Sequence, residues 1–340
     1  MIRQVTEAAM KKVLTLMFAS LVFAGGLFAA PTSKVKIALI VESTVDDKGW
    51  AQAMHDAIMD VQKKYGTGLI EYNYSEKMKP VDAGSAARQY ASRGFDIILC
   101  HGTQFGNTIL DMAEDFPKVS FAFGTSSQIG PKNVFTYMPQ SEETGYINGV
   151  IAGLITKTGI IGVVGPVDGG DAASYNRGFV LGVKASNPKA TVKVAHTGSF
   201  ADYVKAAELA HTHIKAGADV LTGSAQQALG ALRAVAEYKD KPILWLGQDI
   251  AQLATPEAYK VVAAASYDYS AVIETLITKR QANILGGENI PLNFNNAGFV
   301  FKYNDAIGSV LTASIRTAAD KARADFTAGK LTLAWRDVKY

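Results

Sequence analysis

The chain has 340 residues, 48% of them hydrophobic and 19% charged, with a formal net charge of +3. This length exceeds one typical domain and predicts two, each with enough apolar residues for a core. The sequence contains no block of basic residues, so it lacks the electrostatic footprint of a nucleic-acid-binding protein. Its single cysteine, Cys100, excludes an internal disulfide and, because it ends an apolar run, is typical of a buried small side chain.

The N-terminal stretch has the pattern of an export signal. A pair of lysines precedes an apolar run over residues 13–28, and small residues and a proline follow. This order is typical of a secretory signal, and the run is short for a transmembrane helix. We expect residues 1–29 to be a signal peptide that leaves Ala30 first, with translation starting at Met1 or Met10. Because no cysteine follows the run, we expect a soluble periplasmic protein without a lipid anchor.

Strand-like and helix-like runs then alternate along the chain. The strands expected in a first series are 35–41, 69–72, 96–100, 119–123 and 134–137. The helices expected between them are 50–65, 81–93 and 105–114. Such an alternation predicts an α/β fold in which helices cover both faces of a parallel sheet.

A second series of similar size begins at residue 159. Its expected strands are 159–164, 191–195, 219–221 and 242–246, and its expected helices are 172–186, 201–216 and 226–238. Two α/β halves predict two lobes with a cleft between them, and helix 142–154 would begin the passage from one to the other. Three later elements suggest further crossings and therefore a hinge; they are strand 261–266, helix 270–285 and strand 297–302.

We therefore expect two lobes that are each assembled from separate parts of the chain. The first would contain residues 34–141 and about 263–294. The second would contain residues 142–262 and about 295–340.

The end of the first strand is the most informative position for function. In an open α/β sheet, ligands bind outside the carboxyl ends of the strands. There the chain reads Asp46-Asp47-Lys48-Gly49-Trp50. A tryptophan beside two carboxylates is a candidate platform for stacking a ring. The alternative, that Trp50 begins the helix and caps the core, remains equally open.

Five short motifs carry a resemblance to a known family. They are Asp46–Trp50, Gly165–Gly170 with Asn176–Phe179, Gly198–Asp202, Ala216–Val220 and Gly247–Gln252. In their order and spacing they resemble the basic membrane protein family of solute-binding proteins, which serve ABC importers and include purine-nucleoside receptors. The resemblance covers residues 34–335. It implies a two-lobed type I periplasmic binding protein with several interlobe crossovers, a permease as partner, a monomeric state, and no cofactor or metal.

The resemblance also implies how a ligand is held. A purine would lie between two aromatic rings, one from each lobe, which by motif position are Trp50 and Phe200. Stacking on an aromatic ring is worth roughly 1–3 kcal/mol for any base. Asp249 matches a carboxylate that would bind ribose hydroxyls or base N–H groups. The alternative for Asp249 is a helix cap or a carboxylate tied to the hinge.

Three departures from the family pattern bear on the ligand. Ala51 replaces an asparagine, and Thr125 stands about where an aspartate would be. The stretch Ser266–Tyr269 offers no lysine where one is common. Because the aspartate and the lysine would contact a ribose, we expect a nucleobase or related planar heterocycle to be favoured over a nucleoside.

Other polar side chains follow strand ends or open helices and are candidates by position. They are Asp47, His101, Thr103, Gln104, Tyr175, Asn176, Ser224, Gln226 and Asp268. Helix N-termini supply free N–H donors, and an asparagine can read both a donor and an acceptor. For His101 a hydrogen bond to local backbone is an equally open alternative.

Rival classes of protein fit the sequence less well. The glycine-rich stretch Gly165–Gly170 matches neither a dinucleotide-binding nor a phosphate-binding pattern, and His211 and His213 point apart on a helix. We therefore do not expect an enzyme. A sugar or autoinducer receptor of the same architecture remains the alternative, although it would need more Arg and Asn partners for hydroxyls. The export signal argues against a transcriptional effector domain.

Overall fold

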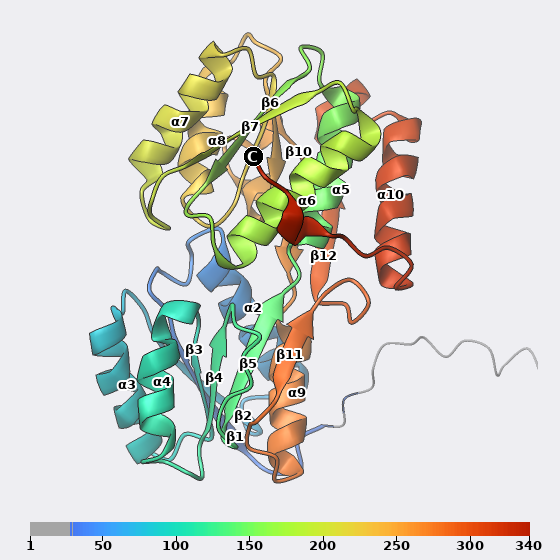
Figure 1. Ribbon diagram of the computed structural model, residues 1–340. Coiled ribbons are helices and arrows are strands. Elements are labelled where there is room, and N and C mark those ends of the chain that lie inside the picture. The colour runs from blue at the N-terminus through green and yellow to red at the C-terminus, as the bar shows by residue number, and fades with distance from the viewer. Residues whose placement is uncertain (1–27, 29) are drawn as a thin grey trace, which may run out of the picture. The chain divides into compact units, whose positions relative to one another are not determined.

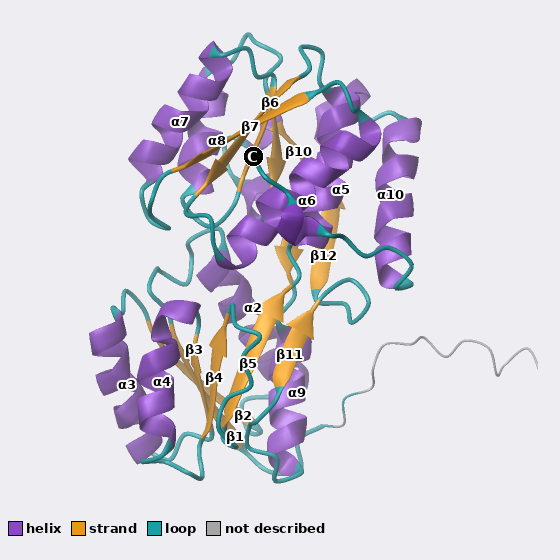
Figure 2. Cartoon of the chain, in the orientation of Figure 1, coloured by secondary structure: helices purple, strands orange, loops and turns teal. Residues whose placement is uncertain are grey.

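A computed structural model describes Phe28 and residues 30–340. The expected signal peptide, apart from Phe28, lies outside the described residues. Residues 31–340 form one compact unit that contains two six-stranded sheets. Figure 1 shows the sheets and their helices along the chain, and Figure 2 shows that helices flank each sheet on both sides.

The first lobe contains a wholly parallel sheet in the order β11-β5-β4-β3-β1-β2. Its strands are β1 (Val35–Ile40), β2 (Ile70–Ser75), β3 (Ile97–Cys100), β4 (Ser120–Gly124), β5 (Val134–Pro139) and β11 (Asn289–Leu292). Its helices are α2 (Trp50–Tyr65), α3 (Pro80–Ser92), α4 (Gly106–Ala113) and α9 (Ser270–Gln281). Alternate residues of β1 point to opposite faces, so Ile37 packs with α2 and α9 while Ile40 packs with α3 and α4.

The second lobe contains a sheet in the order β12-β10-β9-β8-β6-β7, in which only the pairing of β10 with β12 is antiparallel. Its strands are β6 (Ile160–Gly165), β7 (Thr191–His196), β8 (Val220–Gly223), β9 (Leu244–Gly247), β10 (Val261–Tyr267) and β12 (Phe299–Tyr303). Its helices are α5 (Glu142–Ile155), α6 (Gly170–Ser186), α7 (Tyr203–Lys215), α8 (Ala228–Glu237) and α10 (Ala313–Thr327).

Helices α5 and α6 approach each other backbone to backbone. A Cβ atom on Gly149 would lie 2.1 Å from the carbonyl oxygen of Phe179, and one on Gly182 would lie 2.1 Å from that of Tyr146. No side chain fits in that space, so glycine is required at both positions. The close contact fixes the position of α6, whose first turn reaches the cavity described below.

One boundary differs from the expectation. We expected the chain to re-enter the first lobe near residue 263, but β10 pairs with β9 and β12 in the second sheet. The return therefore comes after Tyr267, where α9 leaves to pack against α2. Strand β11 and helix α10 were not predicted. The helical and strand segments that were predicted are present with small shifts at their ends.

Candidate functional site

A cavity of about 230 Å³ is lined by residues from both lobes, a volume on the scale of one small solute. The first lobe lines it with residues 41–43, 48–51 and 101–104 and with Thr125. The second lobe lines it with Val167, residues 169–171, Phe200, Ala225, Gln226, Gln248, Asp249, Gln252 and Tyr267. Nearly all of these residues follow the carboxyl ends of strands, which is where ligands bind in open α/β sheets.

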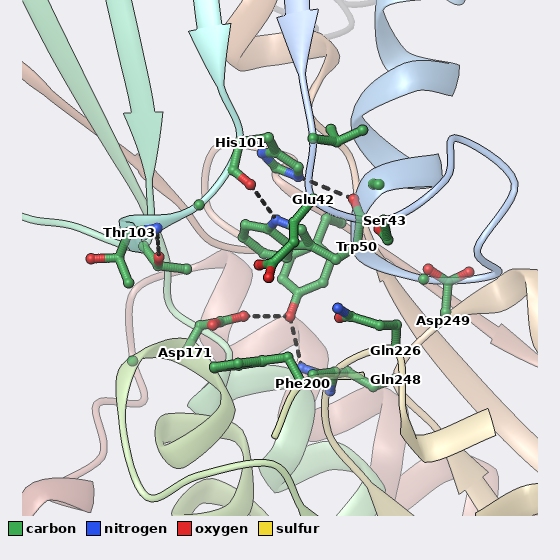
Figure 3. A pocket seen from close by; sticks show the side chains of 18 of the residues that line it. Glu42, Ser43, Trp50, His101, Thr103, Asp171, Phe200, Gln226, Gln248 and Asp249 are labelled. Carbon is green, nitrogen blue, oxygen red and sulfur yellow. Dashed lines mark hydrogen bonds between the residues drawn. The ribbon is translucent and has the colours of Figure 1, made fainter. Parts of the chain in front are cut away.

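An aromatic stack forms the wall from the first lobe. The rings of Trp50, the first residue of α2, and His101, just after β3, lie 4.2 Å apart and 9° from parallel. Tyr269 meets both rings at nearly right angles, 5.6 Å from Trp50 and 5.0 Å from His101, and therefore stands beside the stack. His101 covers one face of the indole, while the indole itself lines the cavity (Figure 3).

Hydrogen bonds hold His101 in one tautomer. Its Nε2 lies 3.0 Å from the carbonyl oxygen of Trp50, which can only accept, so Nε2 carries the proton. Its Nδ1 therefore accepts from the hydroxyl of Tyr137 at 2.6 Å. In return the indole Nε1 of Trp50 donates to the carbonyl of His101 at 3.2 Å. Complete burial lowers the pKa of His101 to about 3, so the stack is neutral.

A tyrosine connects several polar groups of the second lobe. Tyr267, at the end of β10, donates its hydroxyl proton to Asp171 at 2.8 Å and accepts from Gln248 at 2.7 Å. Its ring also meets Trp50 at 82° with centroids 5.1 Å apart. Burial raises the pKa of Asp171 above its usual range. Tyr267 thus fixes a buried carboxyl group beside the aromatic wall.

Asp249 both caps a short helix and lines the cavity. One carboxyl oxygen accepts from the backbone N–H of Ala251 at 2.7 Å, and the other accepts from the hydroxyl of Ser266 at 3.3 Å. Burial, with smaller contributions from Asp47 and Asp56, raises its pKa to about 8. The two roles that the sequence left open are therefore compatible.

Five further predicted residues line the cavity: Thr103, Gln104, Thr125, Phe200 and Gln226. Phe200 follows β7 with 40% of its surface exposed, and the structure places it on the side of the second lobe (Figure 3). Gln104 donates to Glu42 at 2.8 Å. The hydroxyl of Thr125 accepts from the backbone N–H of Thr103 at 3.0 Å. These contacts leave the side chains at the cavity rim and join the loops that follow β1, β3 and β4.

Five predicted residues do not line this cavity, and their contact with a ligand stays a prediction. They are Asp47, Tyr175, Asn176, Ser224 and Asp268. Asp47 is occupied as the acceptor for the backbone N–H groups of residues 49, 51 and 52 at the start of α2. Asp268 accepts from the N–H of Ser270 at the start of α9.

The other three of these residues are buried inside the second lobe. Tyr175 bonds to Thr222 and Asn148 at 2.7 and 2.9 Å, one helical turn deeper than Asp171. Asn176 and Ser224 are buried without lining the cavity. The motifs therefore placed these residues on or next to elements that border the cavity. The sequence did not show which way each side chain points.

The lining residues Asp171, Tyr267 and Gln248 were not predicted from the sequence. Asp171 lies in the first turn of α6, directly after β6, and Trp50 begins the helix that follows β1. A search for equivalent positions in the two halves of the chain could have identified Asp171. Tyr267 and Gln248 gave no such signal, because their roles depend on contacts between distant segments.

Within residues 28 and 30–340, no cluster of His, Cys, Asp and Glu could hold a metal ion. No helix in the same part of the chain is long and apolar enough to cross a membrane.

The sequence is similar to several curated proteins. The pattern of the family described as ABC transporter substrate-binding protein PnrA-like matches residues 34–321. An ABC transporter nucleoside-binding protein of Lactococcus lactis subsp. cremoris is 24% identical over 331 residues, covering 91% of this chain and 92% of that protein. A purine-binding protein of Brucella abortus is 27% identical over 216 residues, covering 63% of this chain and 60% of the relative.

Other relatives match over a smaller share of their length. A putative ABC transporter glucose-binding protein of Haloferax volcanii is 30% identical over 205 residues, 60% of this chain and 51% of that protein. The chain spans about half the length of this relative and of two Listeria antigens that it also matches.

Solved structures share the fold. A solute-binding protein of an ABC transporter system from Conexibacter woesei has a TM-score of 0.71 and 23% identity, covering 88% of this chain and 98% of that one. A second one, from Aeropyrum pernix, has a TM-score of 0.76 and 14% identity, covering 89% and 94%. The expected fold class, two lobes with sheets flanked by helices as in periplasmic binding proteins, is confirmed.

Proposed function

The chain belongs to the family of PnrA-like substrate-binding proteins of ABC transporters, and we propose that it binds a purine between its two lobes. The family assignment confirms the resemblance found in the sequence. It implies a small-molecule ligand and a membrane permease, and a role in transport instead of catalysis. The observation that carries the proposal is the neutral stack of Trp50 on His101 at the wall of an interlobe cavity.

A planar ligand suits this wall for physical reasons. His101 fixes the indole plane from behind, so a base stacking on the other face would meet a preorganised surface. Each such stack is worth roughly 1–3 kcal/mol. Phe200 lines the cavity from the second lobe and would supply the second ring when the lobes close around the ligand. Its 40% exposure leaves ring surface that a ligand could cover.

We further propose a nucleobase as the preferred form of the ligand. The position where the resemblance predicts an aspartate is Thr125, whose hydroxyl is already bonded to Thr103 and to the carbonyl of Gly124. The stretch where a lysine is common, Ser266–Tyr269, has none, and its Tyr267 hydroxyl is bonded to Asp171 and Gln248. Both groups that would hold a ribose are therefore replaced by side chains with protein partners.

A sugar is the second candidate ligand. Sugars also stack on aromatic rings, and the cavity offers Asp171, Asp249, Gln226 and Gln248 as hydrogen-bonding groups. One relative carries a glucose-binding name. Against this candidate, the described lining contains Lys48 as its single cationic side chain and no arginine.

Thermal unfolding tests the proposal. Purified protein would be unfolded and refolded to remove bound ligand, then heated with single purine bases, their nucleosides, ribose, glucose or galactose. A ligand at about 100 times its dissociation constant stabilises the folded state by roughly 2.7 kcal/mol. We expect shifts with bases. Shifts with nucleosides alone would refute the base preference, and shifts with sugars alone would refute the purine proposal.

We also propose export to the periplasm by residues 1–29 without a lipid anchor, and a monomeric receptor. The N-terminal sequence and mass of the protein from a periplasmic extract test these points, together with its size by light scattering. An unprocessed or lipid-modified N-terminus would contradict the export proposal, and a dimer mass would contradict the monomer.

A further inference from the structure

A chain of hydrogen bonds fixes the direction of each donor around Tyr267. The backbone N–H of Ala225 donates to Oε1 of Gln248 at 2.8 Å, so the amide nitrogen of Gln248 must face the other way. That nitrogen donates to the hydroxyl oxygen of Tyr267 at 2.7 Å. The hydroxyl proton of Tyr267 is then directed to Oδ2 of Asp171, 2.8 Å away. At the end of this chain Asp171 is an acceptor.

The surroundings of Asp171 favour the same role. Its carboxyl group lies beside the backbone N–H groups of Asp171 and Ala172 in the first turn of α6, where the helix dipole favours an acceptor. A carboxylate has about four lone-pair sites, so the bond from Tyr267 does not exhaust it. The side chain lines the cavity, next to the aromatic corner made by Tyr267 and Trp50 (Figure 3).

The charges of the residues that line the cavity also favour a ligand with hydrogen-bond donors. Glu42, Asp171 and Asp249 contribute carboxyl groups, whereas Lys48, with an exposed side chain, is the single cation among the described lining residues. An anionic ligand would bring a further negative charge beside these acidic side chains with only Lys48 to compensate it, which is costly. A ligand that presents amino donors would instead add hydrogen bonds to the lone pairs of Asp171 that the Tyr267 hydroxyl does not use.

We propose that Asp171 is a specificity-determining residue and that Tyr267 and Gln248 position it to select purines with exocyclic amino groups over oxo-purines. This inference rests on the proposed purine site and names the class of purine. Adenine and 2,6-diaminopurine are the favoured class, because their amino groups donate. Xanthine and urate are disfavoured, because they present carbonyl oxygens and lose protons readily.

Calorimetric titration with a matched ligand pair tests the proposal. The probes are 2,6-diaminopurine and xanthine, which differ at the same two ring positions by amino and oxo groups. We expect the wild-type protein to bind the diamino compound at least tenfold more tightly. In Asp171→Asn, the Tyr267 hydroxyl should hold the amide oxygen and leave the amide N–H for the ligand. The preference should then fall by at least tenfold.

Two further variants separate selection from general damage. Asp249→Asn alters the other buried carboxyl group of the same lobe and should change both affinities without changing their ratio. Tyr267→Phe removes the donor to Asp171 and should reduce the ratio about threefold, which a merely structural role would not do. Should Asp171→Asn fail to fold, Tyr267→Phe and the wild-type ratio decide the question.

The outcomes distinguish this inference from the proposed function. If the wild-type protein binds neither purine nor any other base, the purine proposal and this inference both fail. If it binds purines but not with the amino preference, or if Asp171→Asn keeps that preference, only this inference is overturned. The ratio of the two affinities could instead change in Asp249→Asn and not in Asp171→Asn. That result would assign selection to Asp249 and would also overturn the inference about Asp171.

Discussion

The two lobes contribute chemically different walls to the same cavity. The first lobe supplies a neutral aromatic wall in which Trp50 and His101 stack and satisfy each other's hydrogen bonds. The second lobe supplies carboxyl and amide groups, foremost Asp171, Gln248 and Asp249. Apolar surface with a few well-placed polar groups is the usual composition of ligand sites. Here the stacked aromatic pair belongs to the first lobe, and the buried carboxyl groups of the lining belong to the second lobe, which also contributes Phe200.

This division suggests that affinity and selection arise separately. Stacking on the first wall tolerates any flat ring, because every base has a π-face. Discrimination between rings requires the directional donors and acceptors of the second wall. Tyr267 joins the two, because its ring packs edge-on against Trp50 while its hydroxyl holds Asp171.

The largest expected effect comes from removing the aromatic wall. Trp50→Ala should raise the dissociation constant of a purine about 100-fold, since a stack is worth roughly 1–3 kcal/mol. The effect is measured by calorimetric titration. Trp50→Phe is the matched control, because it keeps a ring at the start of α2 and should restore most of the affinity. Unchanged binding by a folded Trp50→Ala protein would contradict the aromatic wall.

The next effect concerns the polar wall and pH. Burial raises the pKa of Asp249 to about 8, against an ordinary value of 3.8. Between these values the folded state holds one more proton than the unfolded state, so this group makes the protein less stable as pH rises. The free energy of unfolding should fall by about 3 kcal/mol between pH 5 and 7, since one pKa unit corresponds to about 1.4 kcal/mol.

Asp249→Asn removes this titration while keeping an oxygen that can accept from Ala251. Thermal unfolding of both proteins between pH 5 and 8 measures the effect. The variant should gain stability relative to the wild type as pH rises. Parallel curves would show that Asp249 is ionised in the folded state across this range and would contradict the raised pKa.

A smaller effect on binding is expected from the ring of the second lobe. Phe200→Ala should raise the dissociation constant about tenfold, within the range of one stack. Because Phe200 is exposed, its loss should leave the melting temperature of the ligand-free protein nearly unchanged. A loss of stability without a loss of affinity would show that the side chain packs in the lobe instead of contacting the ligand.

The smallest effect on binding is expected inside the second lobe, behind its wall. Tyr175→Phe removes a hydroxyl bonded to Thr222 and Asn148. It should lower the free energy of unfolding by about 1 kcal/mol, the usual worth of a hydrogen bond. Purine affinity should not change. A weakened affinity would mean that the ligand site reaches deeper into the lobe than the cavity does.

The architecture could be predicted from the sequence because the spacing of apolar residues identifies strands and helices. The order of these elements along the chain then indicates a parallel sheet. Buried strands such as 35–41 alternate with helices, and parallel strands place their carboxyl ends at one edge. That rule brought Trp50, His101, Thr125 and Asp249 to the cavity. The same rule does not show which way a side chain points within a helix. We therefore expected Tyr175 to face a ligand, although its side chain is fully buried and does not line the cavity.

The chain of hydrogen bonds from Gln248 through Tyr267 to Asp171 could not be predicted for a different reason. Tyr267 ends a strand that pairs antiparallel with β12, and its partners Asp171 and Gln248 come from the ends of two other segments. No spacing in the sequence links three such residues. Their association depends on how the second lobe folds, and the sequence alone does not indicate it.

The most direct test of the account is a crystal structure of the ligand-stripped protein after soaking with adenine. We predict a planar ring parallel to the indole of Trp50, on the face opposite His101, with Phe200 on its other side. A nitrogen of the ring or its amino group should lie within hydrogen-bond distance of Asp171. A ligand bound away from Trp50, or an empty cavity at saturating adenine, would contradict it.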